Sequence, residues 1–198
     1  MCDNRSKGKG LIEFGSYPFD EDGTVRPIKW MVLKQESNKA LILSAFGLEA
    51  KPYNAMRKSI TWETCALRKW LNEDFYNAAF TENEKKRIIL TNVQNADNSK
   101  YNTPGGNSTE DKVFLLSIDE AGQYLLGDER KFIPTPYAVK KGVWTWDKGK
   151  CWWWLRSPGN YPACAADVGF DGALHDEGRG VNYGRSSICP ALWIRLDS

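Results

Sequence analysis

The C-terminal segment, residues 151–198, interleaves two kinds of sequence, and this pattern constrains the fold more than any other feature of the chain. The first kind is a frame that opens with residues 152–159 (WWWLRSPG) and closes with residues 190–194 (PALWI). Apolar and glycine anchors recur between these two blocks: Ala165, Ala166, Val168, Gly172, Leu174, Gly178 and Val181. Apolar residues that recur in this way are typical of a packed core.

The second kind fills the gaps between the anchors with aromatic, amide, charged and small residues. These residues are Asn160, Tyr161, Asp167, Gly169, Phe170, Asp171, His175, Asp176, Arg179, Asn182, Tyr183, Gly184, Arg185 and Ser186. Such residue types offer hydrogen-bonding groups and aromatic contact area, as antibody loops do. We therefore interpret the segment as a scaffold that presents a binding surface, with these residues as the candidate ligand-binding positions.

Length and charge bound the class of protein. The chain has 198 residues, and we expect one domain over residues 1–198 with a flexible N-terminus at residues 1–9. The net charge of +2 lacks the basic excess of a nucleic-acid binder. Nine tryptophans favour a rigid core and a recognition surface. We expect an unknown protein or glycan as ligand and no nucleic acid, and the oligomeric state stays open.

The N-terminus leaves the localisation open. No run approaches the ~18–20 apolar residues of a membrane span, and no signal peptide is visible at the start of the chain. These features favour a cytoplasmic or virion protein. Cys2 leaves an alternative, because a mature lipoprotein begins with cysteine, and a lipidated Cys2 would place the chain at a cell surface.

The cysteine pattern argues against a fold stabilised by disulfides or by a bound metal. There are five, an odd number, with no CxxC pair and no histidine cluster. We expect reduced thiols, no metal and no cofactor. A disulfide between Cys164 and Cys189 remains an alternative.

Patterning along the chain predicts an α+β fold with two helices and a small, irregular antiparallel sheet in a β-rich C-terminal half. Strands are expected at 11–17, 28–33, 39–44, 112–117 and 191–196, and helices after Thr61, Thr81 and Ser117. The runs 28–33 and 39–44 form a hairpin, and Thr81 and Glu84 form a capping box. Residues 92–111 are expected to be a long mobile surface loop.

Several of these motifs resemble an uncharacterised bacterial domain family. The similarity runs from residues 14–18 (FGSYP) through residues 61–72 (TWETCALRKWLN) to the WWWLRSPG and PALWI blocks, and so covers nearly the whole chain. The family is associated with the C-type-lectin-like fold, in its formylglycine-generating-enzyme-like branch. One departure is Cys189, because an arginine commonly precedes the PALW motif in such domains.

The resemblance implies a function. Members of this fold group serve as variable proteins of diversity-generating retroelements, in which a reverse transcriptase rewrites adenines at the 3′ end of the gene. The resemblance therefore implies a phage or prokaryotic variable protein with a hypervariable region at residues 159–187.

The residue content of this region agrees with the mechanism. Mutation of both adenines of an AAY codon never yields Lys, Glu, Gln, Met or Trp. Residues 159–187 contain no Lys, Gln, Met or Trp, and Glu177 is the one exception, so we assign it to the frame. A lectin-like domain with one fixed ligand is the alternative.

Enzymatic activity is not expected. The formylglycine-generating branch uses a cysteine pair near its substrate groove, and Cys164 and Cys189 lie in the corresponding half of the chain. No motif supports copper or thiol chemistry, and a fold alone does not establish a function. An oxidase of this type is the weakest alternative.

Two other interpretations concern charged candidates. Asp167, Asp171 and Asp176 permit a calcium site, but their spacing matches no calcium-binding loop, so we expect solvated acids. We expect His175 to be an exposed loop residue, because the sequence shows no partner that would orient it as a general base.

The frame residues have structural interpretations. Trp152, Trp153, Trp154 and Trp193 are expected in the core, with Trp153 pointing away from its two neighbours. Arg156 is expected to fix the turn that follows it.

Overall fold

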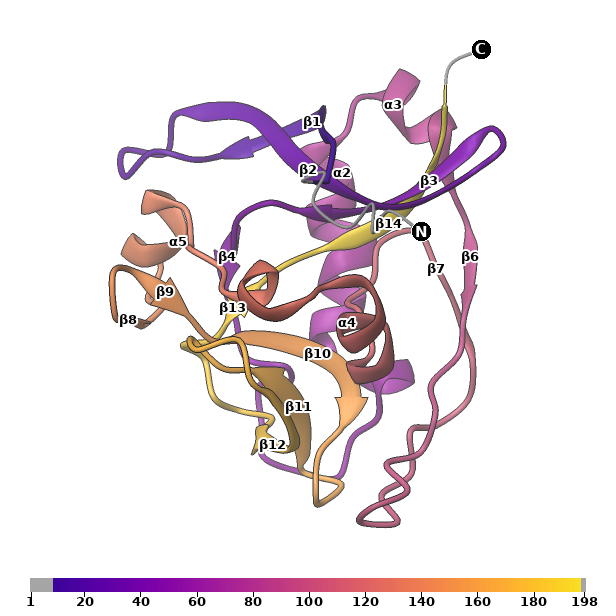
Figure 1. The fold of residues 1–198 in the computed structure, drawn as a ribbon, viewed down its shortest axis with the longest axis vertical. Coiled ribbons are helices and arrows are strands. Elements are labelled where there is room, and N and C mark those ends of the chain that lie inside the picture. Colours follow the sequence, from indigo (N-terminus) through magenta and orange to yellow (C-terminus); the bar gives the residue numbers. More distant parts are fainter. Residues whose placement is uncertain (1–8, 197–198) are drawn as a thin grey trace, which may run out of the picture.

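The computed structural model describes residues 9–196 and has an α+β fold. Its first sheet is antiparallel throughout and contains β1 (Leu11–Pro18), β2 (Val25–Glu36), β3 (Lys39–Ser44), β14 (Ala191–Arg195) and β5 (Ile88–Ile89), in that order. The strand expected at the C-terminal end therefore forms, and it lies inside the sheet between β3 and β5 (Figure 1). The expected hairpin of residues 28–33 and 39–44 is confirmed as part of β2 and β3.

The second sheet carries the C-terminal frame. Its order is β12 (Leu174–Gly180), β11 (Cys164–Val168), β10 (Trp153–Pro158), β13 (Ser187–Ile188) and β4 (Glu49–Ala50). We expected a small antiparallel sheet, but β10 and β13 are parallel. The sheet is mixed because the chain leaves β12 through a loop and returns beside β10.

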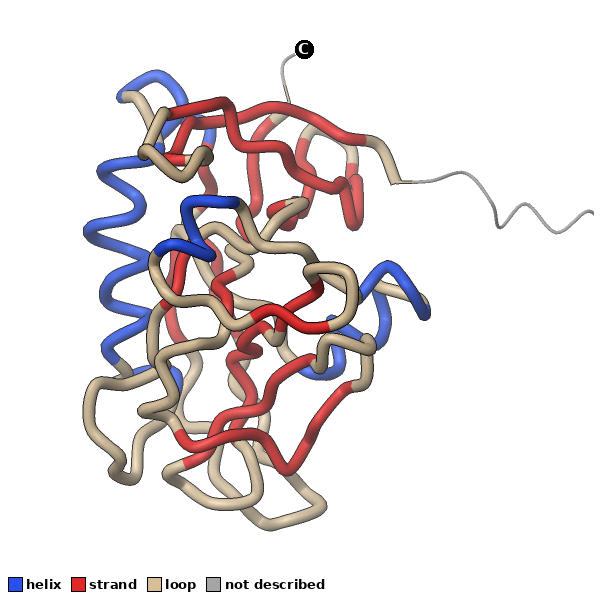
Figure 2. The backbone as a smooth tube through the Cα atoms, turned by 90° about the vertical axis from the view of Figure 1, so that its left-hand side faces the viewer, coloured by secondary structure: helices blue, strands red, loops and turns tan. Residues whose placement is uncertain are grey.

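A helical run packs along one side of both sheets (Figure 2). It consists of η1 (Trp62–Thr64), α1 (Ala66–Trp70), the π-helical turn η2 (Leu71–Phe75) and α2 (Tyr76–Ala79). Leu67, Leu71, Phe75 and Ala79 are buried at intervals of four residues. This spacing places them on one helix face.

Shorter elements complete the fold. They are α3 (Glu82–Arg87), α4 (Ile118–Tyr124), η3 (Gly127–Arg130) and α5 (Pro136–Lys140), with two small hairpins, β6 (Thr91–Val93) with β7 (Thr109–Asp111) and β8 (Thr145–Trp146) with β9 (Lys150–Cys151). The capping box of Thr81 with Glu84 is confirmed, and Ser117 caps α4 with Glu120 in the same way. The expected number of two helices was too low, and α5 was not anticipated.

Two local predictions were wrong around residue 110. Residues 92–111 were expected to be one loop, but β6 and β7 pair at its ends. Residues 112–117 do not form the expected strand: only Phe114 makes an isolated β-bridge, to Ala191 of β14, and the two residues before it bond to the side chain of Asn72. Its Oδ1 accepts hydrogen bonds from the backbone N–H groups of Lys112 (2.7 Å) and Val113 (3.2 Å), and its Nδ2 donates to the Val113 carbonyl (2.9 Å).

The core is rich in tryptophan, as expected, but not at every predicted position. Trp153 and Trp154 are fully buried on opposite faces of β10, which follows from the alternation of a strand. Trp193 is partly buried and packs against the core, whereas Trp152 is partly buried and, contrary to expectation, does not belong to the core.

Candidate ligand-binding surface

The strand β12 lies at the edge of the second sheet and separates two differently built regions. Its alternate side chains point to opposite faces. His175 and Arg179 face the buried carboxylate of Asp167 on β11. Leu174 and Asp176 face a cleft beneath α4.

Asp167 is the anchor of the first region. Its side chain is only 1 % exposed. One carboxylate oxygen lies 2.8 Å from Nδ1 of His175, and the other accepts a 2.8 Å hydrogen bond from Nε of Arg179. A buried carboxylate with partners on both oxygens holds each of them in one orientation.

Arg179 is also held by two aromatic rings. Its guanidinium carbon lies 4.6 Å from the ring centroid of Tyr183 and 5.3 Å from that of Trp152. Both distances are within the range of cation–π attraction. The guanidinium is therefore fixed by one ion pair and two aromatic neighbours.

Aromatic side chains extend from this arginine. Trp152 stacks on Trp144 with 5.4 Å between ring centroids and 17° between ring planes, and it meets the ring of Phe170 edge-on at 4.8 Å. Trp146 contacts both Trp144 (6.0 Å) and Phe170 (6.2 Å). Trp144 is 44 % exposed and Trp146 54 % exposed. We call the set Trp144, Trp146, Trp152, Phe170, Arg179 and Tyr183 the aromatic surface.

The structure brings together four of the candidate positions from the sequence: Phe170, His175, Arg179 and Tyr183. Other candidates are exposed or half-buried away from the aromatic contacts: Asn160, Tyr161, Asp171, Asp176, Asn182, Gly184 and Arg185.

Three candidate positions were assigned wrongly to the displayed set. Asp167, Gly169 and Ser186 are buried. Asp167 is held inside by the ion pair with Arg179. A side chain at Gly169 would collide with the His175 ring and with Asp171, at 2.9 and 2.5 Å. These three residues therefore belong to the frame.

The interpretations of the acids and of the histidine also change. Asp167 is not a solvated acid, whereas Asp171 is exposed and accepts a hydrogen bond from the backbone N–H of Ala173. His175 lies in a strand and has an orienting partner, contrary to expectation. Within residues 9–196 there is no group of three or more metal-ligating side chains.

Sequence reasoning missed Trp144 and Trp146. The signal was present, because two tryptophans one residue apart in an extended segment point to the same face. Their spacing was hidden in a segment of residues 128–150 that reads as polar and proline-containing loops. The backbone N–H of Trp144 donates to the Arg185 carbonyl (3.1 Å), which ties this segment to the C-terminal region.

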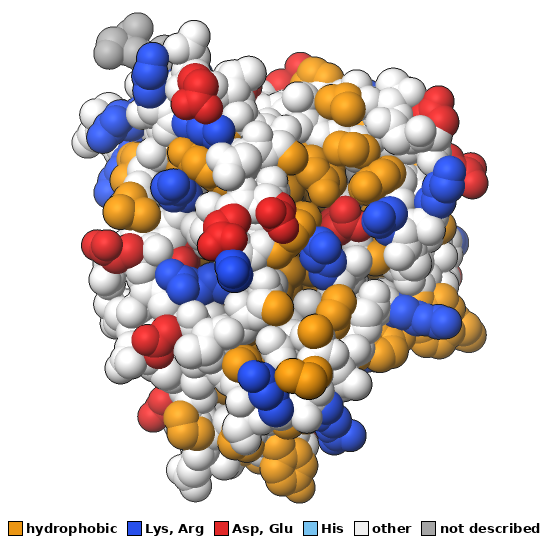
Figure 3. Space-filling model, turned by 180° about the vertical axis from the view of Figure 1, so that it is seen from behind, with side chains coloured by type: hydrophobic (Ala, Val, Ile, Leu, Met, Phe, Trp, Pro, Cys, Tyr) orange, Lys and Arg blue, Asp and Glu red, His pale blue; other side chains and the backbone are white. Residues whose placement is uncertain are grey.

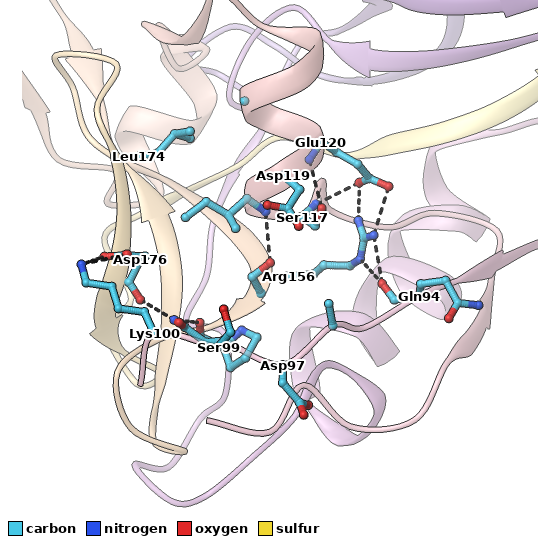
Figure 4. A pocket seen from close by; sticks show the side chains of 16 residues that line it. Gln94, Asp97, Ser99, Lys100, Ser117, Asp119, Glu120, Arg156, Leu174 and Asp176 are labelled. Carbon is cyan, nitrogen blue, oxygen red and sulfur yellow. Dashed lines mark hydrogen bonds and ion pairs between the residues drawn. The ribbon is translucent and has the colours of Figure 1, made fainter. Parts of the chain in front are cut away.

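The second region is a polar cleft of about 620 Å³ between α4, the loop 94–100 and the strands β10 and β12 (Figure 4). Lys100 donates to both carboxylate oxygens of Asp176 at 3.0 and 2.9 Å, at one side of the cleft. Nδ2 of Asn98 donates to the carbonyls of Pro158 and Asp176. These contacts hold the loop against the sheet, so the mobile loop expected here is tied to the frame.

Arg156 forms the inner wall of this cleft and was predicted wrongly to fix a turn. Its side chain is 4 % exposed and pairs with both carboxylate oxygens of Glu120, through Nη1 at 2.5 Å and Nη2 at 3.1 Å. It also donates to the carbonyls of Leu115 and Gln94. Because Glu120 caps α4, this arginine joins β10 to the helix and to the loop.

The thiols are closed off from solvent. Cys65, Cys151, Cys164 and Cys189 are buried and free, so the alternative of a Cys164–Cys189 disulfide is wrong. Burial raises the pKa of Cys65 and of Cys151 to about 12, and it raises the pKa of Cys189 well above its usual value. Cys2 lies outside the described residues, so its lipidation is untested.

A family model described as "Domain of unknown function (DUF6273)" matches residues 37–196. The chain belongs to this family. The matched range runs from before β3 to after β14, so it includes the whole aromatic surface and the cleft. No curated protein and no solved structure matches the chain. Among the described residues, no helix is long and apolar enough to cross a membrane.

Proposed function

We propose that this DUF6273 domain is a ligand-binding display protein and that the aromatic surface is its binding site. The observation that carries the proposal is the partial exposure of three contacting tryptophans, Trp144, Trp146 and Trp152, of which Trp152 lies 5.3 Å from an arginine that is already oriented. Tryptophan, tyrosine and arginine dominate the energetics of protein interfaces. An exposed cluster of these residues is costly to hydrate and gains most from a partner that covers it.

We extend the proposal to the C-type-lectin-like fold and to diversification by a retroelement. The fold proposal is supported by the two sheets, the helical run at the side and the last strand inside the first sheet. The diversification proposal is supported by the alternation of buried anchors and exposed fillers over residues 159–187. Exposed substitutions away from packing change stability by only about 0.5 kcal/mol, so such a surface tolerates many of them.

A lectin-like domain with one fixed ligand is the second candidate. It is favoured by the burial of Asp167, Gly169 and Ser186. A region that is rewritten at every asparagine-derived codon would place substitutions at these buried positions.

Sequencing of the 3′ end of the gene in a clonal population, with its flanking DNA, separates the two candidates. Diversification predicts substitutions at adenine positions of exposed codons such as those of Tyr161, Asn182 and Arg185, with unchanged codons for Asp167 and Gly169. A near-copy template and a reverse transcriptase gene would lie nearby. An invariant 3′ end without a template would overturn diversification and leave a fixed ligand.

Binding itself is tested with a glycan array and a displayed random-peptide library, each probed with the wild-type protein. Binders that use the aromatic surface lose affinity for Trp146→Ala and keep it for Leu90→Ala. Leu90 is a matched control because it is 55 % exposed and follows β5 in the other sheet. Binders whose affinity is unchanged by Trp146→Ala would show that the binding site lies elsewhere on the protein.

A further inference from the structure

We infer that the aromatic surface receives an acidic side chain of a protein ligand, and that Arg179 is the group that binds its carboxylate. The inference rests on the proposed function, because it assigns a ligand chemistry to the same surface. It arises from the position of Arg179, whose guanidinium lies near two aromatic rings, those of Trp152 and Tyr183.

The guanidinium of Arg179 can bind a second carboxylate in addition to that of Asp167. Its Nε is occupied by the buried carboxylate of Asp167 at 2.8 Å, and its guanidinium carbon lies near the rings of Trp152 and Tyr183. Within residues 9–196, Nη1 and Nη2 have no hydrogen-bond partner. The side chain is 27 % exposed, so these donors are accessible at one edge. A planar guanidinium held in one orientation loses little conformational entropy when it binds a carboxylate through two parallel hydrogen bonds.

The charge around this end of the surface favours an acidic partner. Arg185 is exposed, and its backbone carbonyl is bonded to the N–H of Trp144, so its side chain starts beside the aromatic surface. Arg57 lies close to Gly180, the residue after Arg179, since its Nε would be 3.9 Å from a Cβ atom placed on that glycine. The charge of Asp167 is already compensated by Arg179. An incoming carboxylate therefore meets uncompensated arginines at this end.

The part of the surface next to Phe170 carries its own acid. Asp171 and the ring of His175 both approach Gly169, so an anionic group there would meet the Asp171 carboxylate. This difference places the incoming carboxylate at the end of Arg179 and Tyr183.

The shape and composition of the surface favour a protein over a small molecule. None of its side chains lines the cleft beneath α4. Exposed tryptophans that contact one another edge-on and face-on offer a broad apolar area beside the arginine. Protein interfaces concentrate their binding energy in such clusters of Trp, Tyr and Arg, surrounded by weaker contacts.

The chain offers a matched control in Arg26. Its Nε donates to Asp20 at 2.6 Å, and its guanidinium lies 5.2 Å from the ring of Phe19. It has one aromatic neighbour instead of two, its Nη2 also lies 2.6 Å from the Asp20 carboxylate, and its side chain is 56 % exposed. Arg26 is therefore an arginine with a carboxylate and an aromatic neighbour that lacks the enclosure of Arg179 and the two Nη groups that have no partner within the described residues.

The test uses two peptides of sequence Gly-Tyr-X-Tyr-Gly with blocked ends, in which X is Glu or Gln. Each is titrated into the wild-type protein while the indole N–H signals of Trp144, Trp146 and Trp152 and the Nε–H signal of Arg179 are followed by NMR. We expect the Glu peptide to shift these signals and to bind about tenfold more tightly than the Gln peptide, because a charge-assisted bond is replaced by a neutral one. Arg179→Lys should lose this preference, and Arg26→Lys should keep it.

Other outcomes separate the inference from the proposed function. Equal tryptophan shifts with both peptides would overturn carboxylate recognition while the aromatic surface remained a binding site. A third titration uses a trimer of galacturonate, and shifts with this sugar but not with the Glu peptide would overturn a protein partner. Absence of any tryptophan shift with all three probes, together with library binders insensitive to Trp146→Ala, would overturn both proposals.

Discussion

The two faces of β12 are built from different interactions. On the cleft side, Arg156 joins the sheet to α4 and to two backbone carbonyls, and Asn98 joins the loop to the strand ends. On the aromatic side, the contacts beyond Asp167 are mainly between side chains, and the rings remain partly exposed. The first face ties backbone segments together, whereas the second presents side chains.

The difference shows that one strand, β12, can be part of the rigid frame on one face and of the exposed binding surface on the other. A binding surface needs rigid support, because loosely held groups lose entropy on binding. Here the support comes from the buried partners, Asp167 on one face and Arg156 on the other. The face shown in Figure 3 has another character, with hydrophobic side chains interrupted by Lys, Arg, Asp and Glu in a mixed pattern. It presents no single-sign charged patch.

The largest expected effect is that of Arg156→Met. This change leaves Glu120 without its buried partner and removes the donors to two carbonyls, so we expect a loss of about 3–5 kcal/mol in the free energy of unfolding. Urea denaturation measures it. Lys100→Met is the control on the same cleft, because its ion pair with Asp176 is exposed and should contribute about 1 kcal/mol or less. Equal losses of stability in the two variants would show that Arg156 supports the fold no more than an exposed ion pair does.

The next effect tests the support of the aromatic surface. Asp167→Asn keeps the shape but removes the buried charge that orients Arg179 and His175, and we expect a loss of about 1–3 kcal/mol. The measurement is again urea denaturation, with the Glu peptide titration in parallel. An unchanged stability would mean that the charge of Asp167 is not needed to hold the aromatic surface.

The buried thiols predict how stability depends on pH. Unfolded cysteine has a pKa of about 8.5, and burial raises the pKa of Cys65 and of Cys151 to about 12. The folded state therefore keeps the thiol protons after the unfolded state has lost them. Their contribution is intact below about pH 8.5, and it is lost as the pH rises toward 12.

Urea midpoints measured between pH 7 and pH 10 should fall at the alkaline end, and Cys151→Ala should flatten the fall. A thiol reagent at pH 8 should modify these cysteines only in urea. Rapid modification of Cys65 or Cys151 in the native protein, located by peptide mapping, would contradict a closed frame next to the aromatic surface.

The smallest effect on stability is expected for Trp146→Ala. The residue is 54 % exposed, so the loss should stay near 0.5 kcal/mol while binding to the aromatic surface weakens by more than 1 kcal/mol. Thermal unfolding and peptide titration measure the two quantities. A large fall in melting temperature would make this tryptophan part of the frame and weaken the contrast between the two faces.

The prediction from the sequence succeeded where the signal was local. The hairpin of β2 and β3 follows from two β-rich runs around a polar turn, and the caps of α3 and α4 follow from Thr81 and Ser117. It failed where a distant side chain decided the outcome. Residues 112–117 pair with β14 only at Phe114, beside two residues that bond to the Asn72 side chain, and Arg156 pairs with Glu120 in the interior instead of fixing a turn.

The same distinction applies to the candidate site: a local pattern predicted one part of it, and contacts between distant residues determined the rest. The sequence alone indicated the alternation of anchors and fillers in residues 159–187, because apolar spacing reflects burial directly. Tertiary structure decided that Asp167 is buried and that Trp144 and Trp146 join the surface from a segment outside this region. A buried carboxylate is stable only beside its cationic partners, and two exposed tryptophans form a site only where another strand brings aromatic neighbours. Both conditions depend on contacts between distant parts of the chain, which no local pattern encodes.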